Sequence, residues 1–337
     1  MLLFFTASIL SKFTGVCFAA VPLLYSWYKS GKFPKRTILL MLPVFFLGAL
    51  SVLIPIHLQN TAPIDTSMTL FPSNLILSGK LFFFYIKQIL LPWKFMSFYP
   101  RWDISAFQLT NWIYPAGILA TYAVFYYKRH SWGRGAFTLL CFYGISICPA
   151  LGFFKISLFE VTYAADHFTY LSIFPLLFLS CNAGHFSLLK LQTFLFRKSW
   201  APSFFLKRCI SIILISNLAL SSYLLTLNYK DQQTLALRFM ESDPKSPLAY
   251  YFVGAEILRV EPEKAIPFFQ RAILLKPYPA LRSSLYYLLG LAYLSSGKTE
   301  NAVQTFQKGV LLSPENENLK IGLEAAQAAL AKMKSKN

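Results

Sequence analysis

Acidic residues are scarce in the first two thirds of this 337-residue chain. Residues 1–228 contain only four carboxylates, whereas residues 229–337 contain the other ten. The four are Asp65, Asp103, Glu160 and Asp166. Because carboxylates are common general bases and metal ligands, this part of the chain has few groups for proton transfer. The five cysteines form no CxxC pair, so we expect neither a metal site nor a disulfide framework, and no cofactor.

Apolar and basic residues dominate instead. The chain is 55% hydrophobic, with a mean hydropathy of +0.48 and a formal charge of +18. Residues 1–228 carry 18 Lys and Arg against 4 Asp and Glu. The composition is typical of a polytopic membrane protein, and Lys and Arg beside apolar runs orient such proteins. The basic clusters form no continuous soluble patch, so we expect no nucleic-acid partner.

The apolar runs predict about six membrane spans, because a helix needs about 20 residues to cross a bilayer. They lie near 13–28, 37–56, 111–127, 136–157, 169–186 and 209–228. The expected fold class is therefore all-α, with a transmembrane helical bundle followed by a small α-solenoid. Charge bias predicts a multi-pass protein of a bacterial inner membrane whose C-terminal domain, residues 229–337, is periplasmic. The apolar segment 76–93 is expected to lie as a helix at the outer interface of the lipid bilayer.

Residues 283–314 follow the 34-residue pattern of the tetratricopeptide repeat, and residues 246–277 form an earlier copy. The pattern residues are Tyr250, Gly254, Ala265, Phe269, Ala272 and Pro277, then Tyr286, Leu289, Gly290, Tyr293, Ala302, Phe306 and Pro314. Small residues are needed where the two helices of a repeat cross, and aromatic residues fill the remaining space. A final helix over 316–334 is expected to cap the array.

Such repeats bind extended peptides in a concave groove, so a periplasmic peptide or protein is one expected partner. Two repeats make only a short groove, however. A purely structural appendage is therefore an equally good interpretation.

Motifs in residues 1–228 follow one another in a recognisable order. Leu10-Ser11-Lys12 precedes an apolar run, Phe98-Tyr99-Pro100 follows Leu91-Pro92, and residues 165–171 read ADHFTYL. In this order they resemble the bacterial relatives of the transmembrane-and-tetratricopeptide-repeat O-mannosyltransferases, of the GT-C glycosyltransferase superfamily. The resemblance implies a polyprenyl-phosphate sugar as substrate, and it covers the later part of such an enzyme.

Two departures from that family lower the expectation of activity. The family carries an acidic catalytic motif in its first external loop, whereas residues 1–64 contain no Asp or Glu. His167 replaces the arginine of the family motif, and a histidine is only partly charged near neutral pH. We therefore expect a chain that is inactive alone, or half of a split enzyme. The alternatives are an active protein O-glycosyltransferase and a membrane-tethered scaffold for periplasmic proteins.

The candidate site residues follow from position and charge. Asp166 and Asp103 are the candidate catalytic acids. The alternatives are that Asp166 caps the following helix and that Asp103 pairs with the nearby Arg101. A basic set is expected either to hold lipid phosphate or to snorkel to head groups. Its members are Lys80, Lys87, Lys94, Arg101 and His167.

Overall fold

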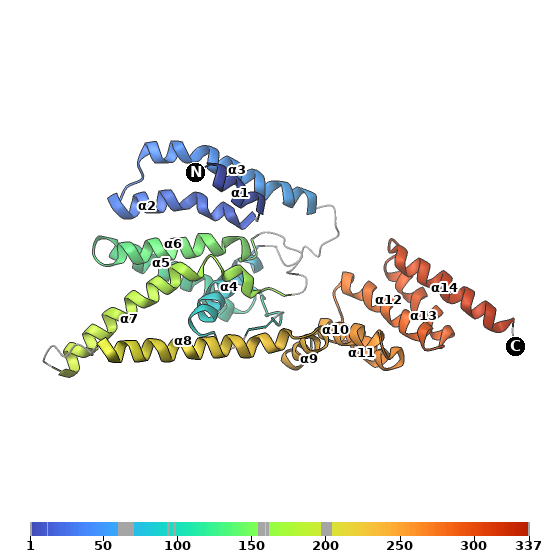
Figure 1. Cartoon of the computed structure of the whole chain (residues 1–337). Helices are drawn as coiled ribbons and strands as arrows, with labels where there is room; N and C mark the ends of the chain where they lie inside the picture. Colours follow the sequence, from blue (N-terminus) through green and yellow to red (C-terminus); the bar gives the residue numbers. More distant parts are fainter. Residues whose placement is uncertain are drawn as a thin grey trace. The chain divides into compact units, whose positions relative to one another are not determined.

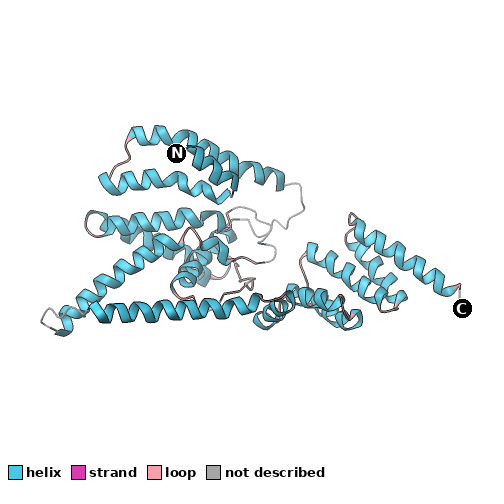
Figure 2. Cartoon of the chain, in the orientation of Figure 1, coloured by secondary structure: helices cyan, strands magenta, loops and turns pink. Residues whose placement is uncertain are grey.

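The described part of the chain consists of helices joined by loops and turns (Figure 2). The computed structural model describes residues 2–11, 13–59, 71–92, 95–96, 99–153, 159, 162–196 and 204–335. The chain divides into two compact units, Met1–Ile213 (unit 1) and Leu214–Asn337 (unit 2). The boundary between them falls within helix α8, Phe204–Thr226, whereas the sequence placed it after residue 228.

Unit 1 contains seven α-helices in its described part, followed by the first half of α8 (Figure 1). They are α1 (Leu2–Ser11), α2 (Val21–Ser30), α3 (Lys35–Gln59), α4 (Ser73–Leu90), α5 (Ile113–Tyr127), α6 (Gly133–Ile147) and α7 (Ile173–Phe196). Helix α4 packs against both α5 and α7, and α6 packs against α5 and α7.

Helix α4 supplies the centre of the unit 1 core. Leu81 and Tyr85 are completely buried, and the Tyr143 hydroxyl of α6 donates a 2.7 Å hydrogen bond to the Phe82 carbonyl. Apolar residues on every side of a helix are typical of a buried helix. A Cβ at Gly79 would lie 2.7 Å from the backbone nitrogen of Pro115, so only glycine permits this approach of α4 to α5. Helix α4 is thus packed into the core of unit 1, and its place at a bilayer interface stays a prediction.

The prediction of a transmembrane helical bundle is wrong. Among the described residues, no helix combines the length and the apolar character needed to cross a bilayer. The run at 13–28 is divided between a 3-10 helix, Phe13–Ala20, and α2. Helices α5 and α6 have 15 residues each, against the roughly 20 that a span requires. The same finding removes the basis for the predicted multi-pass inner-membrane location and periplasmic C-terminal domain.

Unit 2 consists of successive helix pairs. Its complete helices are α9 (Gln232–Ser242), α10 (Pro247–Leu258), α11 (Pro262–Leu274), α12 (Pro279–Ser295), α13 (Thr299–Leu312) and α14 (Glu317–Lys334). Each helix packs against the next from α9 to α14, and α12 also contacts both α10 and α14. Helices α10, α12 and α14 are therefore successive neighbours in one layer, and α11 and α13 pack against this layer. The side chains of Asp231 and Asn316 cap α9 and α14 by accepting the Thr234 and Leu319 amides.

Candidate functional site

Asp166 lies in a hydrogen-bonded network within unit 1. The Tyr99 hydroxyl is 2.7 and 2.9 Å from the two oxygens of the Asp166 carboxylate, and the Gln88 amide donates to the same hydroxyl oxygen at 3.0 Å. Tyr85 accepts the neighbouring Ala165 amide at 3.1 Å. Helix α4 and the Tyr99 segment are thus joined at Asp166.

Thr162 forms hydrogen bonds with the backbone of Tyr99. The Thr162 hydroxyl oxygen accepts a hydrogen bond from the Tyr99 amide at 3.0 Å. The same hydroxyl donates to the Tyr99 carbonyl at 2.9 Å. Thr162 is completely buried, and a buried hydroxyl needs such partners.

Burial raises the pKa of the Asp166 carboxyl to about 6, although the hydrogen bonds from Tyr99 and Met96 act in the opposite direction. The cause is that an ionised carboxylate loses hydration when it is partly enclosed. Asp166 therefore changes its protonation state near neutral pH, which a general base or a pH-sensitive structural group can use.

The hydrogen bonds of Asp166 are not those expected of a helix cap. Asp166 is the first residue of a short 3-10 helix, Asp166–Thr169, whose N-cap residue is Ala165. Its carboxylate is instead bonded to Tyr99, which is 67 residues away in the chain. Helix α7 starts only at Ile173.

Asp103 has a local structural position. Its carboxylate accepts the Ser105 amide at 2.8 Å and the Gln108 side-chain amide at 2.6 Å. Both partners lie within five residues, so Asp103 holds its own turn together. The two candidate acids have separate hydrogen-bond partners among the described residues, Tyr99 for Asp166 and Ser105 and Gln108 for Asp103.

Two of the basic residues proposed for lipid phosphate, Lys80 and Arg101, have separate partners. Lys80 donates to the backbone carbonyl of Asp103, and its ammonium lies 5.5 Å from the centre of the Tyr114 ring. Arg101 lies 5.1 Å from the Tyr163 ring centre, a cation–π distance. Desolvation lowers the pKa of Lys80. Lys87 is exposed on α4, and Lys94 is outside the described residues.

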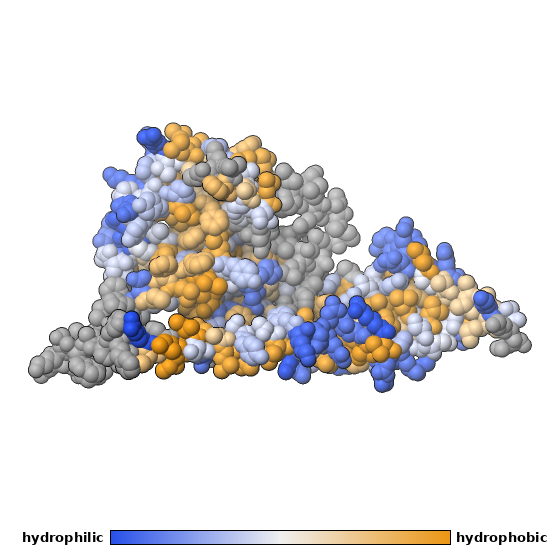
Figure 3. Space-filling view, viewed as in Figure 1, coloured by the Kyte–Doolittle hydropathy of each residue, from blue (hydrophilic) through white to orange (hydrophobic). Residues whose placement is uncertain are grey.

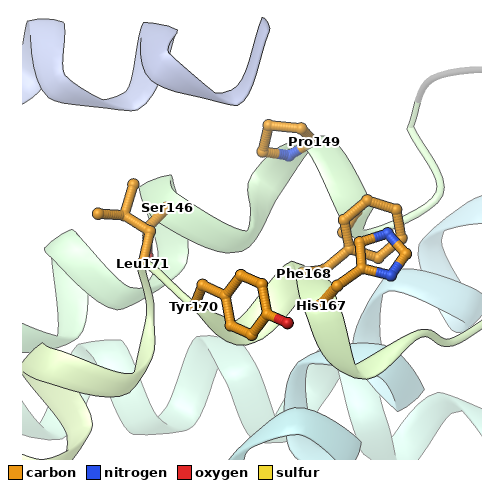
Figure 4. Close-up of a pocket in the computed structure, with 7 residues that line it drawn as sticks. Ser146, Pro149, His167, Phe168, Tyr170 and Leu171 are labelled. Carbon is orange, nitrogen blue, oxygen red and sulfur yellow. The ribbon is translucent and has the colours of Figure 1, made fainter. Parts of the chain in front are cut away.

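His167 lines a small cavity of about 120 Å³. Its ring centre is 4.4 Å from that of Phe168, and Tyr170 lies on the same side of the cavity (Figure 4). Ser146, Pro149 and Leu171 form the opposite part of the lining (Figure 4). The cavity presents one imidazole among mostly apolar groups. Within the ranges that the structure describes, no cluster of three His, Cys, Asp or Glu residues is suited to hold a metal ion.

The pattern residues of unit 2 lie where helices cross. A Cβ at Gly254 would be 2.7 Å from the Phe269 ring, and one at Gly290 would be 2.6 Å from the Phe306 ring. Glycine therefore lets α10 meet α11, and α12 meet α13, at the same structural position. The completely buried residues of the pattern are Ala265, Phe269, Ala272, Ala302 and Phe306.

The remaining pattern residues lie at helix junctions and at the edge of the core. Gln270 of α11 donates to the Tyr293 hydroxyl of α12 at 2.8 Å, which joins successive pairs. The Pro277 carbonyl accepts from Arg282 at 3.2 Å, and Pro314 follows α13 by two residues. Leu289 is buried, whereas Tyr250 and Tyr286 are half-buried.

Two apolar stripes run along the first helices of these pairs. Their residues are half-buried and spaced by four and three positions, which puts each set on one helix face. The stripes are Tyr251, Ala255 and Leu258 on α10, and Tyr287, Leu291 and Leu294 on α12. The α12 stripe packs on its inner side against the core that contains Ala302, Phe306 and Leu319, and α10 and α12 are in contact with each other.

Residues 283–316, which include most of α12 and all of α13, match the family described as Tetratricopeptide repeat. The chain contains a tetratricopeptide repeat. The small glutamine-rich tetratricopeptide repeat-containing protein 2 of Mycosarcoma maydis is 46% identical over 52 residues, which are 15% of each chain. The chain thus spans only a small part of that relative's length. No solved structure matches.

The sequence interpretation missed Tyr99, Gln88 and Thr162 as partners of the Asp166 segment. One signal was available, because a lone glutamine within the apolar run of α4 has to find a hydrogen-bond partner when that run is buried. The partner of Gln88, Tyr99, could not be identified from the spacing of residues in the sequence.

Proposed function

We propose that the tetratricopeptide-repeat array of unit 2 binds an extended segment of a partner protein. Support comes from the match over 283–316 and from the packing of α10, α12 and α14 in one layer. A scaffold or protein-interaction role follows from these features more directly than from any feature of unit 1.

The two apolar stripes carry this proposal. Each contains one half-buried tyrosine, Tyr251 or Tyr287, and the Tyr287 ring centre lies 6.2 Å from that of Phe306. Tyrosine gives a large, rigid contact area and a polar tip, and it is enriched among residues that dominate binding energies. Side chains on alternate positions of an extended peptide could contact the two stripes in turn.

A defined peptide library tests the proposal. The purified full chain is incubated with immobilised twelve-residue peptides, and the peptides that bind are measured in solution. We expect a discrete subset to bind. The double variant Tyr251→Ala, Leu291→Ala should bind that subset at least tenfold more weakly, because truncating two central contacts costs on the order of 2 kcal/mol or more.

The matched control is Gln304→Ala, Gln307→Ala, which changes two exposed residues of α13 behind the layer. The control should bind as the unaltered chain does, and circular dichroism should show equal helix content in both variants. If no peptide binds, or if the stripe variant binds the same peptides equally well, the proposal is wrong.

The resemblance of residues 1–228 to GT-C glycosyltransferases stays a prediction. Sugar transfer is not proposed here, because the contacts of Asp166 and Asp103 are accounted for by bonds within the unit.

A further inference from the structure

A second and larger cavity lies in unit 1 between α4, α5 and α6. Its volume is about 420 Å³, and it is separate from the His167 cavity. Phe82 and Leu151 form buried parts of its wall, at 2% and 6% exposure. Leu119, at 73% exposure, and Phe153, at 45%, lie at its mouth. Apolar side chains on the visible surface of unit 1 are shown in Figure 3.

The lining offers a ligand almost no polar contact. It contains no charged side chain. The Ser78 hydroxyl already donates to the Leu75 carbonyl at 2.9 Å, and the Tyr122 hydroxyl donates to the Leu140 carbonyl at 2.9 Å. A charged group inside would therefore lose its hydration without compensation.

Two thiols complete the lining. Burial raises the pKa of Cys141 to about 11 and also raises that of Cys148, so both remain neutral at physiological pH. A neutral thiol behaves as a small apolar group. The occupant of the cavity must itself be uncharged and apolar.

The dimensions indicate a chain rather than a compact molecule. Lining positions extend from Leu75 to Phe82 on α4 and from Cys141 to Cys148 along α6 and just beyond it. Seven residues of α-helix correspond to about 10 Å. An apolar cavity of about 150 Å³ holds one six-carbon benzene, so in the same proportion 420 Å³ corresponds to at most roughly 17 carbons.

We propose that this cavity binds one aliphatic chain of roughly 10 to 15 carbons, whose polar end stays outside, at the Leu119 and Phe153 mouth. The inference is independent of the peptide-binding proposal for unit 2. It assigns a small-molecule site to unit 1.

A chain-length series of n-alkanols, from hexanol to octadecanol, tests the size of the site. Binding to the full chain is measured by titration calorimetry. Affinity should rise about three- to fourfold per added methylene, then stop rising between roughly 10 and 15 carbons, with one molecule bound per chain. Adsorption to exposed apolar side chains would rise without a plateau and without a fixed stoichiometry, and that result would overturn the proposal.

Two variants test the location. Leu119→Trp adds volume at the exposed mouth, and Cys141→Phe adds volume to the wall. Each should weaken dodecanol binding at least tenfold. Val124→Trp is the matched control, because Val124 is 55% exposed on the same helix α5 and does not line the cavity.

Thermal unfolding shows whether each variant is folded. If Cys141→Phe fails to fold, Leu119→Trp decides the question, since its side chain extends outward. Unchanged affinity in Leu119→Trp, or equal weakening in Val124→Trp, would contradict the assigned location.

Discussion

At the scale of single residues, the contact between Asp166 and Tyr99 has the clearest consequence. The carboxyl is partly enclosed, its pKa is raised to about 6, and the Tyr99 hydroxyl is bonded to both of its oxygens. A carboxyl with a raised pKa binds its proton more strongly in the folded chain than in the unfolded chain. Folding is therefore linked to the protonation of this group.

Asp166→Asn should change the pH dependence of stability. The pKa of Asp166 in the folded chain, about 6, lies above the usual aspartate pKa of 3.8. Between those values the folded state binds more protons, so the contribution of Asp166 to stability falls as the pH rises and is lowest above pH 6. Thermal unfolding midpoints from pH 4 to 8 should decline with pH less steeply in Asp166→Asn than in the unaltered chain.

Tyr99→Phe provides a second test of the same group. Removing the hydroxyl removes a hydrogen bond that lowers the Asp166 pKa. The decline of the thermal unfolding midpoint with pH should therefore extend to higher pH. Equal pH profiles for the unaltered chain and Asp166→Asn would mean that Asp166 does not titrate in this range.

At the scale of elements, helix crossings in unit 2 depend on glycine. The second pair is the sharper case, since a Cβ at Gly290 would lie within 2.8 Å of three atoms of the Phe306 ring. Phe306 is completely buried and also contacts the α14 side of the core, so it has little room to move.

Gly290→Ala should destabilise unit 2. Overpacking a close contact costs about 1–3 kcal/mol, which outweighs the gain of about 1 kcal/mol or less from replacing a helical glycine by alanine. Denaturant unfolding followed by circular dichroism measures the difference. Gly184→Ala is the control, because no atom lies within 4 Å of its added Cβ, and it should be neutral or stabilising. A stabilising Gly290→Ala would show that the crossing can relax.

Local patterns predicted the helix pairs of unit 2, because Gly290 and Phe306 belong to adjacent helices joined by a short turn. They did not predict the position of α4. An apolar run that carries Lys80 and Lys87 on one face is consistent with an interfacial helix and with a buried one. The position of α4 depends on its packing against α5 and α7, and these helices are distant from α4 in the sequence.

The candidate site was predictable only in part, for the same reason. The motif at 165–171 drew attention to Asp166, but its partner Tyr99 is 67 residues away. The predicted spans were wrong because an apolar run of sufficient length can be divided between helices, as at residues 13–28.

At the scale of the whole molecule, the two units can be followed separately. All six tryptophans lie within residues 1–213: Trp27, Trp93, Trp102, Trp112, Trp132 and Trp200. Tryptophan fluorescence therefore reports on unit 1, whereas circular dichroism reports on the helices of both units. Compact units with their own cores are expected to unfold as separate cooperative transitions.

We expect Gly290→Ala to shift the circular dichroism transition of unit 2 and to leave the fluorescence transition unchanged. The comparison is made in a single urea titration of the full chain. If both signals shift together, the units unfold as one cooperative body, since α8 runs across their boundary.

Helix α14 has one further consequence. A Cβ at Gly322 would lie 2.5 Å from the Phe306 ring, and Leu319 and Ala326 of the same helix are completely buried. Helix α14 therefore occupies the place against α12 and α13 where the first helix of another pair would pack. Any helix inserted between α13 and α14 would therefore need a residue without a Cβ at the place where Gly322 meets the Phe306 ring.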